Sequence, residues 1–386
     1  MPGRPAVIAP QANSLFKNDS RLPYHPSIPH YEKAPSLMSK SMKSLLAIGI
    51  LACAGVAGAQ EQVVNLYSAR HYATDEALYN GFTKATGIKV QRVDSDDAGI
   101  MARLKAEGSA SPADVILLVD AARLYRGEAD GLFLPIRSKL LEDTIPANLR
   151  ATPAADGGIP WFGLSTRARV IVYNKAKVNK EDVDTYEELG DPKNKGKLCI
   201  RSGSHPYNLS LFGAVLEHMG EQKTEAWLKG VNSNLARPPK GGDTDQIRAV
   251  AAGECDIAVT NSYYLARLMR SEKPEDKAVV EKVAVVFPNQ QSWGTHLNIA
   301  GGAVARHSKH QANAIKFLEY LASPEAQNYF ANGNNEWPAA KGVELDNPAL
   351  KAMTDGKPFK SETIPIGAVG ANTTKVQQML DRAGLR

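Results

Sequence analysis

Between residues 62 and 120, apolar positions follow two different spacings in turn. Apolar or β-branched runs of strand length are separated by longer stretches with the spacing of an amphipathic helix. The predicted order is strand, helix, strand, helix, strand, at residues 62–69, 73–87, 88–95, 99–112 and 113–120. This alternation predicts a parallel sheet whose strands are joined by crossover helices.

The alternation returns after a long β-rich segment, "WFGLSTRARVIVYNK" (161–175). It comprises a strand at 196–203, one long helix at 209–231, and a strand that leads into a helix at 255–270. A strand that passes from one α/β block to the other would leave a cleft between two lobes. The pattern therefore predicts an α/β protein with two lobes, a hinge and a ligand cleft.

The chain has 386 residues, which exceeds the usual size of a single core and favours two domains. We predict a first lobe made of residues 60–160 and 286–335. The second lobe is predicted to comprise residues 161–285 and 336–386.

Residues 1–59 have the pattern of a non-mature extension that ends in a signal peptide. In "MKSLLAIGILACAGVAGAQ" (42–60), a lysine precedes a short apolar run and a small-x-small cleavage site. We expect cleavage after Ala59 and export to the periplasm. The net charge of +5 arises mostly here, because six basic and two acidic residues lie before residue 60. The remaining +1 gives no electrostatic case for nucleic acid or an anionic membrane surface.

Export also affects the expected redox state of the two cysteines that follow the signal peptide, Cys199 and Cys255. In an oxidising compartment they could form a disulfide. Two buried free thiols are an equally reasonable reading of the sequence, so both states stay open at this point.

Tyrosine and histidine gather in three segments that directly follow predicted strands. In sheets of this kind, ligands bind outside the carboxyl ends of the strands, so these segments predict one shared site. The residues are His71, Tyr72, His205, Tyr207, Tyr263 and Tyr264.

A phenol has a pKa of about 10 and is a poor acid or base at neutral pH, but its phenolate is a hard anionic oxygen donor. A small, highly charged cation such as Fe³⁺ stabilises the deprotonated form of such a ligand. Four phenolates around Fe³⁺ would leave a net negative cluster, for which Arg167 and Arg267 are candidate cationic neighbours. Of the two arginines in "STRARVIVY", we expect Arg167 to face the cleft and Arg169 to face solvent.

From about residue 62 onward, the chain resembles the periplasmic ferric iron-binding proteins of bacterial ABC uptake systems. The resemblance rests on "YSARHYATDEALYNGFTKATGIKV", "WFGLSTRARVIVYNK", "RSGSHPYNLSL", "GDTDQIRAVAAGECDIAVTNSYYLARL" and "SPEAQNYFANGNNEWPA". It implies the transferrin-like, type II periplasmic-binding-protein fold. It also implies a partnership with an inner-membrane permease whose ATPase lies on another chain.

The resemblance assigns iron ligation to the positions that match the family's motifs, which are His71, Tyr72, Tyr207, Tyr263 and Tyr264. Arg167 matches an arginine close to the metal, and Arg267 matches a neighbour of the site in some relatives. Carbonate or another synergistic anion is implied beside Fe³⁺. His205 departs from the family pattern, and its role as ligand, neighbour or exposed side chain stays open.

Other classes of function fit the sequence less well. There is no Walker A motif, G-x-S-x-G elbow, H-E-x-x-H or dinucleotide fingerprint. We therefore expect a monomeric binding protein and not an enzyme. The alternatives are capture of an organic solute, such as a polyamine or phosphonate, and a periplasmic enzyme with a tyrosinate-bound iron.

Overall fold

The computed structural model describes residues 62–70 and 72–385. The chain divides into two compact units, Met1–Ala59 and Gln60–Arg386, and every described residue belongs to the second. The predicted signal peptide and its cleavage site lie outside the described residues, and so does His71. Within the described part of the chain, no helix is both long and apolar enough to cross a membrane.

Ten strands form one mixed sheet whose main path runs β2-β1-β3-β9-β5-β7-β6. Strands β1, β2 and β3 are parallel, as are β6 and β7, whereas β5 and β9 are antiparallel to their neighbours. The strands are β1 (Val63–Ser68), β2 (Lys89–Asp94), β3 (Val115–Leu118), β4 (Phe133–Leu134), β5 (Phe162–Asn174), β6 (Leu198–Cys199), β7 (Ile257–Asn261), β8 (Val283–Val286), β9 (Leu297–Ala305) and β10 (Trp337–Pro338).

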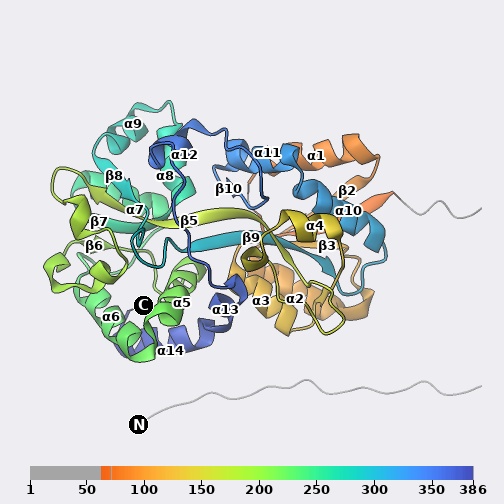
Figure 1. Cartoon of the computed structure of the whole chain (residues 1–386), viewed down its shortest axis with the longest axis horizontal. Helices are drawn as coiled ribbons and strands as arrows, with labels where there is room; N and C mark the ends of the chain where they lie inside the picture. Colours follow the sequence, from red (N-terminus) through yellow and green to blue (C-terminus); the bar gives the residue numbers. More distant parts are fainter. Residues whose placement is uncertain (1–61, 71, 386) are drawn as a thin grey trace, which may run out of the picture. The chain divides into compact units, whose positions relative to one another are not determined.

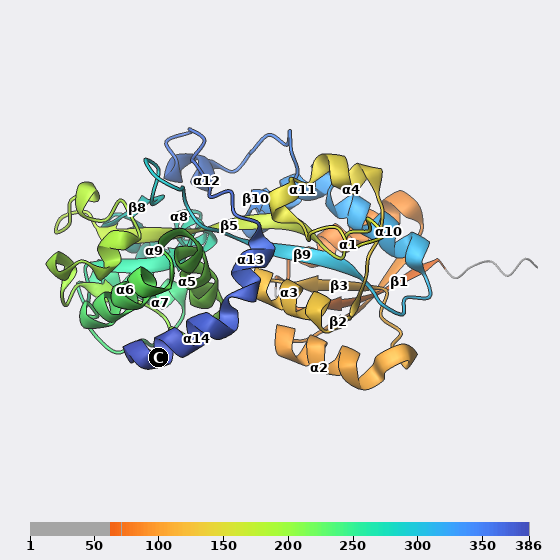
Figure 2. The same cartoon turned by 60° about the horizontal axis from the view of Figure 1, so that its bottom comes forward.

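Helices cover both faces of this sheet at each of its ends (Figures 1 and 2). They are α1 (Asp75–Thr86), α2 (Asp97–Glu107), α3 (Ala121–Ala129), α4 (Lys139–Thr144), α5 (Pro206–Met219), α6 (Glu221–Ser233), α7 (Asp243–Ala252), α8 (Ser262–Met269), α9 (Pro274–Val280), α10 (Gln311–Leu321), α11 (Pro324–Asn334), α12 (Pro348–Met353), α13 (Ile366–Ala371) and α14 (Thr373–Ala383). The α/β class predicted from the sequence is confirmed.

Strand β5 is the link between the two ends of the sheet (Figure 1). Its first half pairs with β9 as far as Ala168, and from Arg169 onward it pairs with β7 and β8. Buried apolar side chains form one cluster around β1, β3 and β9 and two further clusters around β6 and β7. The chain therefore has a separate core on each side of the point where β5 changes partners.

Two local features bear on the predictions made from the sequence. One prediction is wrong, and one pair of alternatives is decided. The single helix predicted at 209–231 is two helices, α5 and α6, because Gly220 between them has a φ of 75°, a left-handed conformation that favours glycine. Cys199 and Cys255 form a disulfide with a Cα–Cα distance of 5.9 Å. The disulfide joins β6 to the residues that lead into β7.

Candidate metal centre

The tyrosines predicted to bind metal lie where strands pass into helices. Tyr72 lies between β1 and α1, and Tyr207 lies in the first turn of α5. Tyr263 and Tyr264 open α8, directly after β7 ends at Asn261. These loops lie at the carboxyl ends of parallel strands, where sheets of this type bind ligands. The local prediction that the paired tyrosines occupy the first turn of a helix is confirmed.

The structure brings these phenols together from segments far apart in the sequence. The hydroxyl oxygens of Tyr207 and Tyr263 are 3.3 Å apart. The ring of Tyr72 meets the ring of Tyr263 edge-on, with centroids 6.2 Å apart, and Tyr264 stacks on Tyr263 at 4.2 Å. Tyr72, Tyr207 and Tyr263 are all buried. Four phenols from three loops thus share one small region of the molecule.

Burial sets the protonation state of these phenols. It raises the pKa of Tyr207 to about 12, although the positive charge of Arg167 acts in the opposite direction. Burial raises the pKa of Tyr72 well above its ordinary value, and the carboxylate of Glu336 adds to this effect. For Tyr263, burial and then the neighbouring tyrosines raise the pKa well above its ordinary value. At neutral pH these three hydroxyls are therefore protonated.

Arg167 lies beside this cluster and is completely buried. None of its three guanidinium nitrogens makes a hydrogen bond within the described part of the chain. Its Nη1 lies 3.6 Å from Oε1 of Glu336, and its guanidinium carbon lies 6.0 Å from the ring centroid of Tyr263. A buried guanidinium with unused donors is costly, so this geometry favours a site that gains negative charge.

Arg267 lies on the outer side of the paired tyrosines. Its guanidinium carbon is 5.9 Å from the ring centroid of Tyr263 and 5.6 Å from that of Tyr264, and the residue is exposed. It therefore adds positive charge close to both phenols from the solvent side.

Glu336 is the residue of this site that the sequence analysis missed. It is fully buried and accepts hydrogen bonds from the hydroxyls of Tyr72 (2.8 Å) and Ser165 (2.5 Å). Burial acts to raise its pKa, but Arg167 and Arg70 outweigh burial and hold the pKa below its ordinary value. Its segment, "NNEWPA", belongs to the family resemblance, yet nothing in the local pattern marks this glutamate as a partner of a residue 264 positions away.

The prediction that Arg169 faces solvent is wrong, because this residue is fully buried. Residues two apart on a strand point to the same side, so Arg167 and Arg169 both point inward. Arg169 binds Asp243 (2.6 Å) and donates to the side chain of Asn208 (2.5 Å), the residue after Tyr207. Asp243 also accepts from the backbone N–H of Asn261 (2.7 Å), two residues before Tyr263. This network fixes the two tyrosine-bearing loops of the second core relative to each other.

His205 is the N-cap of α5. Its Nδ1 accepts the backbone N–H of Tyr207 (3.2 Å), and its ring meets the ring of Tyr207 edge-on with centroids 4.6 Å apart. Burial, together with the charge of Arg201, lowers the pKa of His205 to about 3. The residue is therefore neutral at physiological pH and supports Tyr207 from the side.

A cavity of about 620 Å³ opens beside the phenols, and Tyr72, His205 and Tyr207 are among the residues that line it. Among the residues that the structure describes, no three His, Cys, Asp or Glu side chains gather so that they could hold a metal ion. The phenol oxygens beside this cavity are donors suited to hard cations.

Two cores joined by a long strand, with a cavity lined by loops at strand ends, define the architecture of a solute-binding protein. Residues 77–356 match the family model described as bacterial extracellular solute-binding protein. The chain belongs to this family.

Several of the relatives found by comparison carry names that refer to iron, and a thiamine-binding periplasmic protein of Brucella suis also matches, at 24% identity. Iron uptake protein A1 of Synechocystis is 46% identical over 325 residues, which cover 84% of this chain and 88% of the relative. The Fe(3+)-binding periplasmic protein of Serratia marcescens is 29% identical over 345 residues, covering 89% and 96%. The resemblance inferred from the sequence motifs is thereby confirmed.

Solved structures give the same picture. A Trichodesmium protein (IdiA, FutA) in complex with iron and citrate ligands aligns with a TM-score of 0.79 at 48% identity, covering 84% of this chain and all of the other. Ferric iron-binding protein A of Mannheimia haemolytica, in an open conformation, aligns with a TM-score of 0.76 at 40% identity, covering 84% and 98%. These alignments confirm the predicted two-lobe fold.

Proposed function

We propose that this protein captures Fe³⁺ in the periplasm and delivers it to an inner-membrane ABC permease, whose ATPase is a separate chain. The iron would be bound by the phenolates of Tyr72, Tyr207, Tyr263 and Tyr264, with His71 as a further donor. One observation carries the proposal: buried phenols from three loops lie together, beside an arginine whose guanidinium nitrogens have no hydrogen-bond partner among the described residues. The iron-related names of the relatives support the same cargo.

Charge explains why the site would select a trivalent ion. Three phenolates cancel the charge of Fe³⁺, and a fourth leaves one negative charge on the cluster. Arg167 is positioned to stabilise that charge from inside the protein, and Arg267 from the solvent side. The free donors of Arg167 would also suit a synergistic anion such as carbonate, bound beside the iron.

Capture would proceed by closure of the lobes, with the boundaries given by the sequence analysis. Tyr207, Tyr263 and Tyr264 come from the second core and would bind iron first. Tyr72, together with His71, would join from the first core as the lobes close. The ligand bonds made only in the closed state would favour closure. The open form reported for the Mannheimia protein supports such a movement in this fold.

The protein would act as a monomeric carrier that turns nothing over. An organic cation such as a polyamine would be expected to use unpaired carboxylates, whereas Glu336 is already held between Arg70 and Arg167. For this reason we favour the ferric ion over an organic solute.

The test is a titration of the chain from Gln60 onward with ferric nitrilotriacetate. We expect a visible phenolate-to-iron charge-transfer band that saturates at one iron per chain. Tyr263→Phe should weaken or remove the band, whereas Tyr173→Phe, a buried tyrosine of β5 outside the site, should leave it unchanged. Absence of the band, or a band that Tyr263→Phe does not alter, would contradict the proposed ligand set.

A further inference from the structure

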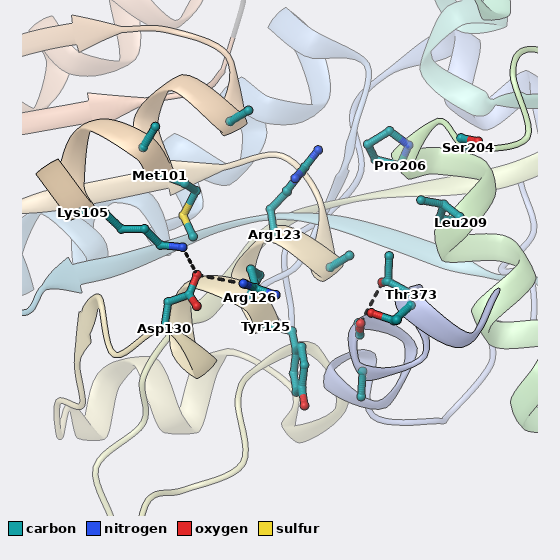
Figure 3. Close-up of a pocket in the computed structure, with 16 residues that line it drawn as sticks. Met101, Lys105, Arg123, Tyr125, Arg126, Asp130, Ser204, Pro206, Leu209 and Thr373 are labelled. Atoms are coloured by element: carbon teal, nitrogen blue, oxygen red, sulfur yellow. Dashed lines mark hydrogen bonds and ion pairs between the residues drawn. The ribbon is translucent and has the colours of Figure 1, made fainter. Parts of the chain in front are cut away.

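We propose that a second cavity, which adjoins the cavity beside the metal centre at Pro206, binds a small organic dicarboxylate through Arg123. This cavity has a volume of about 510 Å³ and lies where α2 and α3 of the first core face α5 and α14 (Figure 3). Its volume lies within the range typical of small-molecule sites. No known property of the metal centre requires it.

Arg123 supplies the charge that would anchor an anion. The residue is half-buried, and its guanidinium projects into the space between α3 and the start of α5 (Figure 3). Its side chain makes no hydrogen bond or ion pair among the described residues, whereas its backbone N–H donates to the carbonyl of Asp120 (3.1 Å). The carboxylate of Asp97 is close enough for the charge of Arg123 to act on it, but it accepts a hydrogen bond from the backbone N–H of Val119 (3.2 Å) and not from Arg123. The guanidinium fork of Arg123 is thus available for a bidentate carboxylate.

A second positive charge lies at another wall of the same cavity. Lys105 and Arg126 both bind the single carboxylate of Asp130, at 2.6 and 3.0 Å. Two cations and one anion leave this group with a net charge of +1 (Figure 3). Together with Arg123, the cavity carries a net charge of +2, which matches a dianion.

The remaining lining favours an organic anion over a simple inorganic one. Met101 and Leu209 offer apolar surface on opposite sides of the cavity, one from each core. Ser204 and Thr374 add hydroxyl groups to the lining. A ligand with two carboxylates and an apolar body would satisfy both parts of this lining.

The test uses 5-fluoroisophthalate as the probe and ¹⁹F NMR line broadening as the readout, with the iron-free chain from Gln60 onward. We expect saturable binding that Arg123→Gln weakens about tenfold, because charge-assisted hydrogen bonds are lost. Arg103→Gln is the matched control, since Arg103 is an exposed arginine of α2 that does not line the cavity. The uncharged diamide of the probe should bind much more weakly than the dianion.

Several outcomes would overturn the proposal. These are no saturable binding, equal binding of the diamide, or equal affinity in Arg123→Gln and the wild-type chain. Binding that Arg167→Gln abolishes but Arg123→Gln leaves intact would locate the anion at the metal centre instead. If Arg167→Gln does not fold, Tyr263→Phe serves the same purpose. None of these results depends on whether the protein binds iron, so the two proposals fail independently.

Discussion

Acidification should weaken iron binding steeply, because protons compete with the ion for the phenol oxygens. Burial raises the pKa of Tyr207 to about 12 and raises those of Tyr72 and Tyr263 well above the ordinary value. At pH 7 all three hydroxyls carry a proton in the iron-free protein. In the proposed ligand set each phenol would release its proton on binding iron, so proton release would be coupled to capture.

The size of the effect follows from the number of protons. For Tyr207, a pKa of about 12 lies about five units above pH 7, so ionisation costs roughly 7 kcal/mol that the iron–oxygen bond must offset. Each proton displaced changes the apparent association constant about tenfold per pH unit. Loss of four protons, one from each of Tyr72, Tyr207, Tyr263 and Tyr264, predicts a decrease of about ten-thousandfold for each unit of acidification.

The assay is competition with nitrilotriacetate between pH 6 and pH 8, followed through the charge-transfer band. Titrations without protein correct for protonation of the competitor and hydrolysis of iron. Tyr207→Phe should reduce the dependence to about a thousandfold per pH unit, because one proton fewer is displaced. Tyr173→Phe should keep the wild-type dependence. A wild-type change of tenfold or less per pH unit, or an unchanged slope in Tyr207→Phe, would refute the assignment of these phenols as protonated ligands.

Three further predictions concern the residues that support the site. Glu336→Gln should lower the free energy of unfolding by about 3–5 kcal/mol in urea titrations at pH 7, because it leaves the buried Arg167 without its carboxylate partner. The exposed Glu325 changed to Gln should have little effect, and an equal loss in both variants would contradict the reasoning. Because the folded-state pKa of Glu336 lies below its unfolded value, its contribution is complete above about pH 4.3 and decreases as the pH falls through the folded-state pKa. Replacing Cys199 and Cys255 with serine should lower the free energy of unfolding by about 4 kcal/mol, since the disulfide closes a loop over a separation of 56 residues. An unchanged midpoint of urea unfolding would show that the disulfide constrains the unfolded chain little. His205→Asn should retain the helix cap and the affinity for iron. His205→Ala should lower the free energy of unfolding by about 1 kcal/mol, because the cap is lost. A loss of iron affinity in His205→Asn would identify His205 as a metal ligand instead.

The sequence was informative wherever chemistry follows from local position. Tyr263 and Tyr264 follow an apolar strand, and this context alone predicts that they open a helix at the carboxyl end of a sheet. Tyr207 follows Pro206, a residue favoured in the first turn of a helix. Such features depend on a few neighbouring residues, so they can be recognised without knowledge of the fold.

The features that were missed depend on contacts between distant segments. Glu336 meets Tyr72 only because α11 and β10 pack against the strands of the first core. Arg169 was assigned to solvent on the idea that it alternates with Arg167, although residues two apart on a strand point to the same side. Its partner Asp243 lies 74 residues away and gives no local signal. A buried ion pair and an exposed charge look alike in a sequence, since only the tertiary structure decides which charges lose their water.

The protonated state of the phenols explains why tyrosine suits this site better than aspartate or glutamate. Carboxylates would be charged without iron, and several of them buried together would repel one another and destabilise the empty protein. Phenols stay neutral there, because burial raises the pKa of Tyr207 to about 12. The empty centre then holds one buried carboxylate, Glu336, which faces Arg167, while Arg70 is paired with Asp75 at 2.6 Å. Iron with four phenolates would add a single negative charge to this balanced arrangement. The site can therefore exist without its cargo and still take up a trivalent ion with little change in net charge.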